Sequence, residues 1–344
     1  MGLSISIDED CLHHNISVIR DRCKDKKFCA VVKANAYGHG VKQVARAIHD
    51  KVDYFAVATV GEGVFLRKIG IDIPILVLCF SQIDAYLGVD YELELGVSRI
   101  DQVRSLNRVK HTLQKTPKAH VQVNTGMNRF GKNPEDISSL LECVDKVEIC
   151  GVYSHIYSVQ SIECQIARFM RAEQEVKDNF SHAISHISAT DAVVSGVCYG
   201  DMVRVGIGMY GYPTTHFKPV MRVSARVLSL RLLQKEDTAG YNGVFTARRD
   251  NTLIGIIDGG YADGVFRHYL GKICVLYRDK TFPIVGVCMD TVIVDFSGSE
   301  VSIGDIVHYI GSVDNACQYA DDLALCAGTI PYEILTGFGN LVRS

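Results

Sequence analysis

The chain has 344 residues, of which 47% are hydrophobic and 22% charged, a composition that is typical of folded proteins and excludes disordered and collagen-like chains. The net charge of −3 provides no basic excess for binding phosphates, so no nucleic-acid partner is expected. At roughly 100–200 residues per domain, the length predicts two domains.

The sequence also predicts where the protein works. No apolar run approaches the roughly 18 residues of a membrane-spanning helix, so no membrane partner is expected. The first ten residues, MGLSISIDED, lack the basic and apolar parts of a secretory signal. The 12 cysteines are scattered without a C-x-x-C pair or a cluster with histidine. We therefore expect a cytoplasmic protein with reduced thiols and no metal site.

The first part of the chain alternates between two patterns. Eight short β-rich runs occur at residues 28–34, 54–59, 75–80, 91–96, 118–126, 148–155, 186–190 and 202–211. Segments with apolar residues at helical spacing separate them, for example residues 41–51 and 162–179. This alternation predicts an α/β fold, a TIM-type (β/α)8 barrel over residues 9–215. An open, doubly wound sheet is the main alternative.

The pattern changes after residue 215. Strand-like runs at 223–233, 252–258, 273–277, 282–295 and 305–311 are separated by glycine-containing turns, and only residues 317–325 have a helical pattern. We therefore predict a mainly antiparallel β domain over residues 216–344.

Several polar residues fall at the ends of the predicted barrel strands, where such barrels place their chemistry. Lys33 follows an apolar run, and desolvation there lowers a lysine pKa towards the range of a nucleophile or base. Arg204 lies within an apolar strand, where a buried guanidinium needs a partner. Gly206 offers backbone N–H groups to a phosphate. Each residue by itself also has a simpler interpretation: Lys33 could be a solvated loop residue, and His155 could be a structural histidine.

The second domain carries a cluster of its own. The segment Gly-Gly-Tyr-Ala-Asp-Gly places Tyr261 between glycine and acidic residues, and Cys288-Met289-Asp290 follows further along. By themselves, the first segment is most simply a surface turn, and Cys288 is a core thiol.

Five segments together resemble the alanine racemase family, which uses pyridoxal phosphate (PLP). They are Val-Lys-Ala-Asn-Ala-Tyr-Gly-His-Gly at 32–40, Arg-Val-Gly-Ile-Gly-Met-Tyr-Gly at 204–211, Gly-Tyr-Ala-Asp-Gly at 260–264, Met-Asp at 289–290 and Tyr-Glu-Ile at 332–334. The resemblance runs from Ser4 almost to the C-terminus. It implies a PLP-binding barrel and a C-terminal β domain that residues 1–8 join as a strand.

The resemblance implies a role for each site residue. Lys33 carries PLP covalently, and Arg204 faces its pyridine nitrogen. Arg129 contacts the cofactor and the substrate carboxylate, and the backbone N–H of Met289 helps to bind that carboxylate. The phosphate is held by Tyr37, Thr190, the backbone at Gly206 and Ile207, and Tyr332.

The implied reaction is the interconversion of L-alanine and D-alanine in a homodimer, with D-alanine supplied to a bacterial cell wall. Lys33 is the base on one face of the substrate, and Tyr261 of the other subunit is the base on the opposite face. We expect a hydrogen-bonded pair of His155 and Arg204 to support Tyr261 in this role.

The sequence departs from the family in ways that leave the substrate open. Gln122 stands where the family often has a carbamylated lysine, and we expect it to hydrogen-bond Arg129 instead. An arginine that commonly lines the substrate entrance is missing before Cys288, and its acidic partner corresponds to Gln160. A serine or broad-specificity racemase is therefore the nearest alternative. A PLP-dependent decarboxylase and a non-catalytic PLP carrier are further alternatives, disfavoured by Tyr261 and by the second domain respectively.

Overall fold

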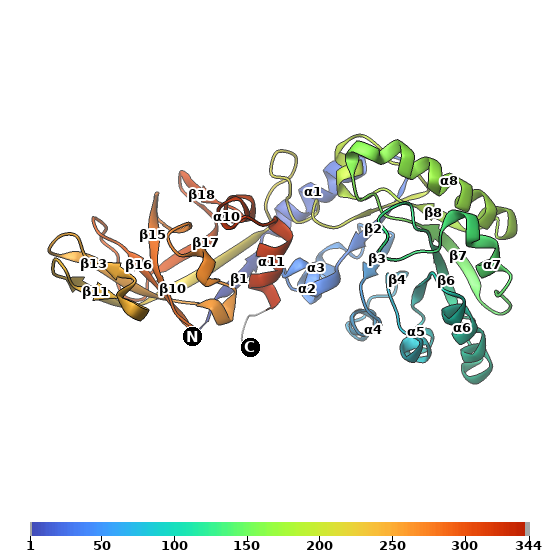
Figure 1. Cartoon of the computed structure of the whole chain (residues 1–344), viewed down its shortest axis with the longest axis horizontal. Helices are drawn as coiled ribbons and strands as arrows, with labels where there is room; N and C mark the ends of the chain where they lie inside the picture. Colours follow the sequence, from blue (N-terminus) through green and yellow to red (C-terminus); the bar gives the residue numbers. More distant parts are fainter. Residues whose placement is uncertain (1, 341–344) are drawn as a thin grey trace. The chain divides into compact units, whose positions relative to one another are not determined.

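The computed structural model describes residues 2–340, which form two compact units (Figure 1). The barrel unit comprises His13–Ala36 and Val41–Met209. The β unit comprises the chain up to Leu12, Tyr37–Gly40, and the chain from Tyr210 onwards.

The barrel unit is built on eight parallel strands. They are β2 (Lys27–Val31), β3 (Tyr54–Val57), β4 (Ile75–Val77), β5 (Glu94–Val97), β6 (Lys118–Gln122), β7 (Glu148–Tyr153), β8 (Ile184–His186) and β9 (Met202–Val205), and they pair in the order β8-β7-β6-β5-β4-β3-β2-β9. Backbone hydrogen bonds from Asp201 to Ser185 and from Arg204 to Ser188 join the two ends of this order. The sheet is therefore a nearly closed barrel, which confirms the predicted α/β class and decides against the open sheet.

The strands are short and buried, because helices cover the sheet from outside and side chains fill it from inside. All four residues of β3 and of β9 are buried. The helices are α1 (Glu9–Arg22), α2 (Lys33–Tyr37), α3 (Val41–Ile48), α4 (Val60–Lys68), α5 (Ala85–Asp90), α6 (Ile100–Leu113), α7 (Ile137–Leu141), α8 (Ile162–Asn179) and α9 (Thr190–Val194). Polar side chains are also buried in the barrel, among them Glu94, His120, His186 and Arg204.

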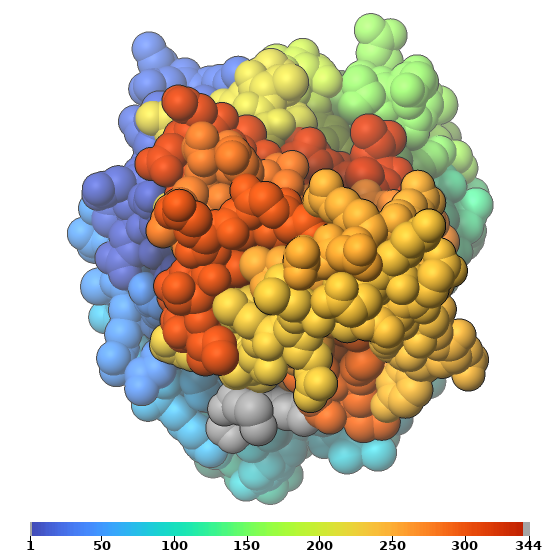
Figure 2. Space-filling model, turned by 90° about the vertical axis from the view of Figure 1, so that its left-hand side faces the viewer, coloured from blue at the N-terminus to red at the C-terminus, as the bar shows by residue number. Residues whose placement is uncertain are grey.

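The β unit is an antiparallel sheet of eight strands. They are β1 (Ser4–Ile7), β10 (Met221–Leu233), β13 (Thr252–Asp258), β14 (Cys274–Tyr277), β15 (Lys280–Val287), β16 (Thr291–Asp295), β17 (Ile306–Val313) and β18 (Ala316–Gln318). The long strand β10 pairs with β1, β13 and β17, which curls the sheet onto itself. A small hairpin, β11 (Thr238–Ala239) and β12 (Phe245–Thr246), is separate. Two helices complete the unit, α10 (Ala320–Ala327) and α11 (Pro331–Asn340). Figure 2 shows one face of this unit in yellow, orange and red as a closely packed surface.

Several predicted strands and one helix differ from the structure. Most barrel strands end earlier than predicted: β2 ends at Val31 and β9 at Val205, because the residues beyond them belong to turns. The predicted strand at 282–295 is in fact two strands, β15 and β16. A turn separates them, and a hydrogen bond from the Cys288 N–H to the Thr291 carbonyl oxygen closes this turn. The sequence pattern missed α11, which begins at a proline in the first helical position.

The segment after β2 has an unusual backbone. Ala34, Asn35, Ala36 and Tyr37 all have φ between 52° and 55°, which is a left-handed helical turn without glycine. Such a conformation costs L-residues roughly 1–2 kcal/mol each, so it has to be held by its surroundings. The Asn35 side chain accepts a hydrogen bond from the Val41 N–H at 2.8 Å and fixes the end of this turn.

The prediction that all thiols are reduced is wrong for one pair. Cys23 and Cys198 form a disulfide across 175 residues of sequence, with their Cα atoms 5.8 Å apart. Their proximity arises from the fold and leaves no spacing signal in the sequence. The other ten cysteines are free. Within residues 2–340, no helix has both the length and the apolar character that crossing a membrane requires.

Candidate active site

Lys33 lies just beyond the buried end of β2, as predicted for a functional lysine. Burial is the main cause that lowers the pKa of its amino group, and the nearby positive charge of Arg129 lowers it further. Arg204 adds a smaller effect of the same sign, whereas the Glu62 carboxylate raises the pKa. The barrel unit therefore brings Lys33, Arg129 and Arg204 within electrostatic reach of one another.

Arg204 is buried in β9 and held by two carbonyl groups and one imidazole. Its Nη1 donates to the Nδ1 atom of His186 at 2.7 Å and to the His186 carbonyl oxygen at 2.9 Å. Its Nη2 donates to the Ser154 carbonyl oxygen at 2.5 Å. The guanidinium carbon also lies 5.2 Å from the ring centroid of Tyr153, which stacks on His186. These contacts supply the partners that a buried guanidinium requires.

His155 lies near Arg204 but is not its hydrogen-bond partner. Desolvation by the surrounding protein lowers the pKa of His155 to about 3, and the charges of Arg204, Lys33 and Arg129 lower it further, although the residue as a whole is exposed. Among the described residues, no hydrogen bond joins His155 to Arg204, so the predicted pair is wrong in this respect. His186, which the sequence reading did not single out, takes that position.

The expected contact between Gln122 and Arg129 is also wrong. In the part of the chain that the structure describes, the two side chains make no hydrogen bond with each other. Arg129 is exposed, and its guanidinium carbon lies 5.9 Å from the centroid of the Phe130 ring. The side chain of Arg129 is therefore not held in place by Gln122.

Thr190 and the segment after β9 lie side by side in the barrel unit. The Thr190 hydroxyl accepts a hydrogen bond from the Gly208 N–H at 3.3 Å. The hydroxyl proton of Thr190 stays available for donation. Gly206 and Ile207, whose backbone was predicted to bind phosphate, directly precede Gly208, and Ile207 is buried. The predicted phosphate-binding groups of this unit are thus neighbours.

The two predicted site segments of the β unit also meet. The N–H of Tyr261 donates to the Cys288 carbonyl oxygen at 3.0 Å. The N–H of Ala262 donates to the Met289 carbonyl oxygen at 3.1 Å. The buried Asp263 carboxylate accepts from the Gly260 N–H at 3.0 Å. A Cβ at Gly260 would collide with the Met289 carbonyl oxygen, so this contact requires glycine. The segment is therefore a packed turn rather than a free surface loop.

Tyr37 and Tyr332 form a second cluster in the β unit. Their ring centroids are 5.8 Å apart, and Tyr37 lies 5.0 Å from Tyr210. Burial raises the pKa of Tyr37, so its phenol is a hydrogen-bond donor at neutral pH. Gly38 lets the segment after Tyr37 approach α11 closely, because a Cβ at this position would collide with the Leu335 carbonyl oxygen of that helix.

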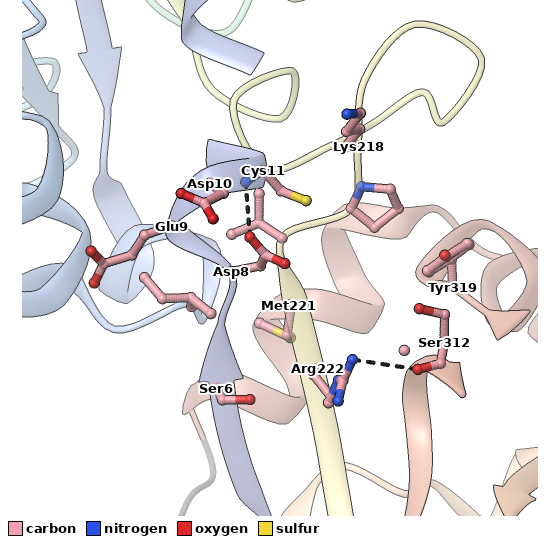
Figure 3. A pocket seen from close by; sticks show the side chains of 14 residues that line it. Ser6, Asp8, Glu9, Asp10, Cys11, Lys218, Met221, Arg222, Ser312 and Tyr319 are labelled. Carbon is pink, nitrogen blue, oxygen red and sulfur yellow. Dashed lines mark hydrogen bonds between the residues drawn. The ribbon is translucent and has the colours of Figure 1, made fainter. Parts of the chain in front are cut away.

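A pocket of about 710 Å³ in the β unit contains none of the predicted site residues (Figure 3). Asp8, Cys11 and Arg222 are among its lining residues. Their polar groups already have partners: the Asp8 carboxylate accepts from the Cys11 N–H at 2.9 Å, and Arg222 donates to the Ser312 carbonyl oxygen at 3.4 Å. Because none of the predicted site residues lines this pocket, it is not the candidate site.

Comparison with known proteins gives consistent matches over the whole chain. The family model described as "Alanine racemase, N-terminal domain" matches residues 7–214, and "Alanine racemase, C-terminal domain" matches residues 220–344. An alanine racemase of Thermodesulfovibrio yellowstonii is 34% identical over 353 residues, covering 99% of this chain and 96% of that protein.

Solved structures agree with the sequence matches. The alanine racemase of Clostridium difficile 630 has a TM-score of 0.91 at 27% identity and covers 98% of this chain and 93% of that chain. The structure of alanine racemase from Bartonella henselae with covalently bound pyridoxal phosphate has a TM-score of 0.85 at 27% identity, covering 100% of this chain and 99% of that one.

Proposed function

The chain belongs to the alanine racemase family, and on this premise we propose that it interconverts L-alanine and D-alanine with PLP as its cofactor. The observation that carries the proposal is the environment of Lys33, where burial and two arginines lower the pKa of the amino group. A lysine with a depressed pKa is the group that reacts covalently with an aldehyde.

The residues of the barrel unit fit PLP. An aldehyde-bearing phosphate ester needs an amine, cationic or hydrogen-bonding groups around its ring, and donors for its phosphate. Lys33 supplies the amine, and Arg204 supplies a fixed cation whose charge persists in spite of burial. Thr190 and the backbone of Gly206 and Ile207 supply phosphate donors, joined in the proposal by Tyr37 and Tyr332 of the β unit.

PLP, when bound, accepts the electron pair that the α-carbon keeps when its proton leaves. The chain then has to supply a base on each face of the substrate. Lys33 serves one face, and its Nζ atom takes the proton. Because the pKa of this amino group is lowered, a larger fraction of it is neutral and able to accept a proton. Tyr261 serves the other face, and the Cys288 and Met289 carbonyl groups hold its turn in place.

Arg204 sets how strongly the cofactor attracts electrons. A permanent positive charge beside the pyridine nitrogen disfavours protonation of that nitrogen. With Arg204 in this place, bound PLP would be a weaker electron acceptor, which would favour return of the proton to the α-carbon. Arg204 would in this way suppress transamination as a side reaction.

Arg129 and the Met289 N–H are proposed to bind the substrate carboxylate. Arg129 is exposed, which suits a side chain that has to meet a ligand from solvent. The missing acid–base pair at the entrance, where Gln160 stands, removes one restriction on substrate size or charge. L-serine is therefore the second substrate to test.

A chiral assay tests the proposal directly. Purified protein with PLP is incubated separately with L-alanine, L-serine and L-lysine, and Lys33→Ala serves as the control. We expect D-alanine to form fastest, and only when Lys33 is present. Faster formation of D-serine or D-lysine would assign a different substrate. Bound PLP without any D-isomer would overturn the racemase and favour a decarboxylase or a PLP carrier.

We further propose a homodimer in which Tyr261 of one subunit completes the site of the other. Mixing inactive Lys33→Ala and Tyr261→Phe proteins, after dissociation and reassociation, tests this sharing. A hybrid dimer with shared sites has one site in which both bases are intact, so activity should recover to about a quarter of the wild-type value. Sites built within one subunit would give no recovery, and native mass spectrometry, which resolves the three dimers by mass, would show whether hybrids formed.

A further inference from the structure

Four buried polar side chains form an unbroken line through the interior of the barrel. Arg204 Nη1 lies 2.7 Å from Nδ1 of His186, and Nε2 of His186 lies 2.8 Å from Nδ1 of His120. Nε2 of His120 then lies 2.7 Å from Oε2 of Glu94. The line begins in β9, passes through β8 and β6, and ends at the first residue of β5.

The chemistry of the two ends fixes every proton in this line. A guanidinium has donors and no acceptor, so Nδ1 of His186 has to accept and carries no proton. A histidine needs at least one N–H, so Nε2 of His186 is protonated and donates to Nδ1 of His120. His120 in turn carries its proton on Nε2 and donates it to the Glu94 carboxylate. Both imidazoles are therefore neutral, and each hydrogen bond points from Arg204 towards Glu94.

We propose that Glu94 and His120 are positioning residues that act on Arg204 through His186. The Glu94 carboxylate accepts only, so it prevents His120 from adopting the other tautomer. With the other tautomer, Nδ1 of His120 would donate, and His186 would have to carry its proton on Nδ1, facing the donors of Arg204. The role assigned to Arg204 at the pyridine nitrogen rests on the proposed function, whereas the proton arrangement does not.

The surroundings of Glu94 support this role. His120 is fully buried and Glu94 is 5% exposed, so little water competes for the hydrogen bond between them. Burial is the main cause that raises the pKa of the Tyr54 phenol, and the Glu94 charge raises it further, so Tyr54 adds no second negative charge beside Glu94 at neutral pH.

Nitrogen-15 NMR of the histidine-labelled holoenzyme tests the proton arrangement. The imidazole signals of His120 and His186 are assigned by their loss in His120→Phe and His186→Phe. We expect both rings to be neutral with the proton on Nε2. A proton on Nδ1 of either ring, or a doubly protonated ring at neutral pH, would overturn the proposal whether or not the protein is a racemase.

Two substitutions at Glu94 test its effect on Arg204. Glu94→Leu removes the acceptor, whereas Glu94→Gln retains an acceptor oxygen in the same place. Glu94→Leu leaves the buried Nε2–H of His120 without an acceptor, so we expect it to loosen the line to Arg204, to lower kcat about 10- to 100-fold and to raise the amount of pyridoxamine phosphate formed per racemisation. Glu94→Gln should keep the Nε2 tautomers and stay within about threefold of the wild type.

Val121→Ala is the matched control for lost packing, since Val121 is a fully buried neighbour whose side chain points to the opposite side of β6. It should leave the tautomers and the side reaction unchanged. Equal behaviour of Glu94→Leu and Val121→Ala would overturn the positioning role. An inactive wild-type protein that still shows the Nε2 tautomers would refute the proposed function and leave the proton arrangement intact.

Discussion

The carboxylate of Glu62 accepts a hydrogen bond from the backbone N–H of Ala34 at 2.7 Å, immediately after Lys33. Its other oxygen accepts from the N–H groups of Ala58 and Thr59 at 2.8 and 3.1 Å. One side chain at the start of α4 therefore ties the loop after β3 to the left-handed turn that follows β2. That turn is costly for its residues, so this contact helps to hold Lys33 in place.

Replacing Glu62 with alanine should release the Lys33 turn. Loss of hydrogen bonds to a charged acceptor costs about 1.5–3 kcal/mol of unfolding free energy. Misplacement of a reacting group lowers kcat, here about tenfold or more. Urea unfolding and the chiral assay measure both effects. The exposed Glu142→Ala serves as the control, and wild-type kcat in Glu62→Ala would contradict the positioning of Lys33 by Glu62.

Arg204→Glu should convert part of the racemase activity into transamination. A carboxyl group beside the pyridine nitrogen would favour its protonation and so strengthen the cofactor as an electron acceptor. We expect pyridoxamine phosphate to accumulate at least about tenfold faster, a change of about one pKa unit or 1.4 kcal/mol. Its absorption during incubation with L-alanine is the readout. Arg204→Lys keeps the charge and should not show this increase.

The pH dependence of stability should report His155. Its pKa is lowered to about 3 in the folded protein, whereas an unfolded histidine titrates near its ordinary value of about 6.5. Between these values the unfolded chain binds the extra proton, so stability falls as the pH decreases from about 6.5 towards 3. His155→Gln should flatten the dependence of the urea midpoint on pH in this window. An NMR titration that gives His155 a pKa above about 6 would contradict this expectation.

Gly260→Ala should disturb Tyr261 without unfolding the protein. The added Cβ would meet the carbonyl oxygens of Met289 and Cys288, so the Tyr261 turn has to move. Such overpacking costs about 1–3 kcal/mol, and displacement of the proposed base should lower kcat by about 100-fold. Circular dichroism and the chiral assay separate the two effects. Gly61→Ala, where the nearest atom is 4.0 Å away, is the matched control and should retain wild-type activity.

The sequence predicts the barrel well because alternating β-rich and helical runs have distinct periodicities. Most of its errors fall at the ends of elements. The run at 202–211 looks continuous, yet β9 ends at Val205, since apolar residues after a strand can also line a loop. Helix α11 was missed because proline, which opens it, is more often a helix breaker than a first residue.

The candidate site is predictable only in part for a similar reason. Motif residues such as Lys33, Arg204 and Tyr261 can be recognised within short segments. Their partners cannot, because His186 and Glu62 reach them through the fold and carry no local pattern. The error over His155 arose in this way: two histidines lie at the ends of neighbouring strands, and only the structure shows which one Arg204 contacts.

The disulfide between Cys23 and Cys198 gives the barrel an unusual topology. It converts the chain between these residues into a covalent ring that contains all barrel strands except β9. A protease that cuts once inside the ring would therefore release no fragment until the protein is reduced. A nicked sample should run as one chain on a non-reducing gel and as two after reduction, so the ring keeps a cleaved barrel in one piece.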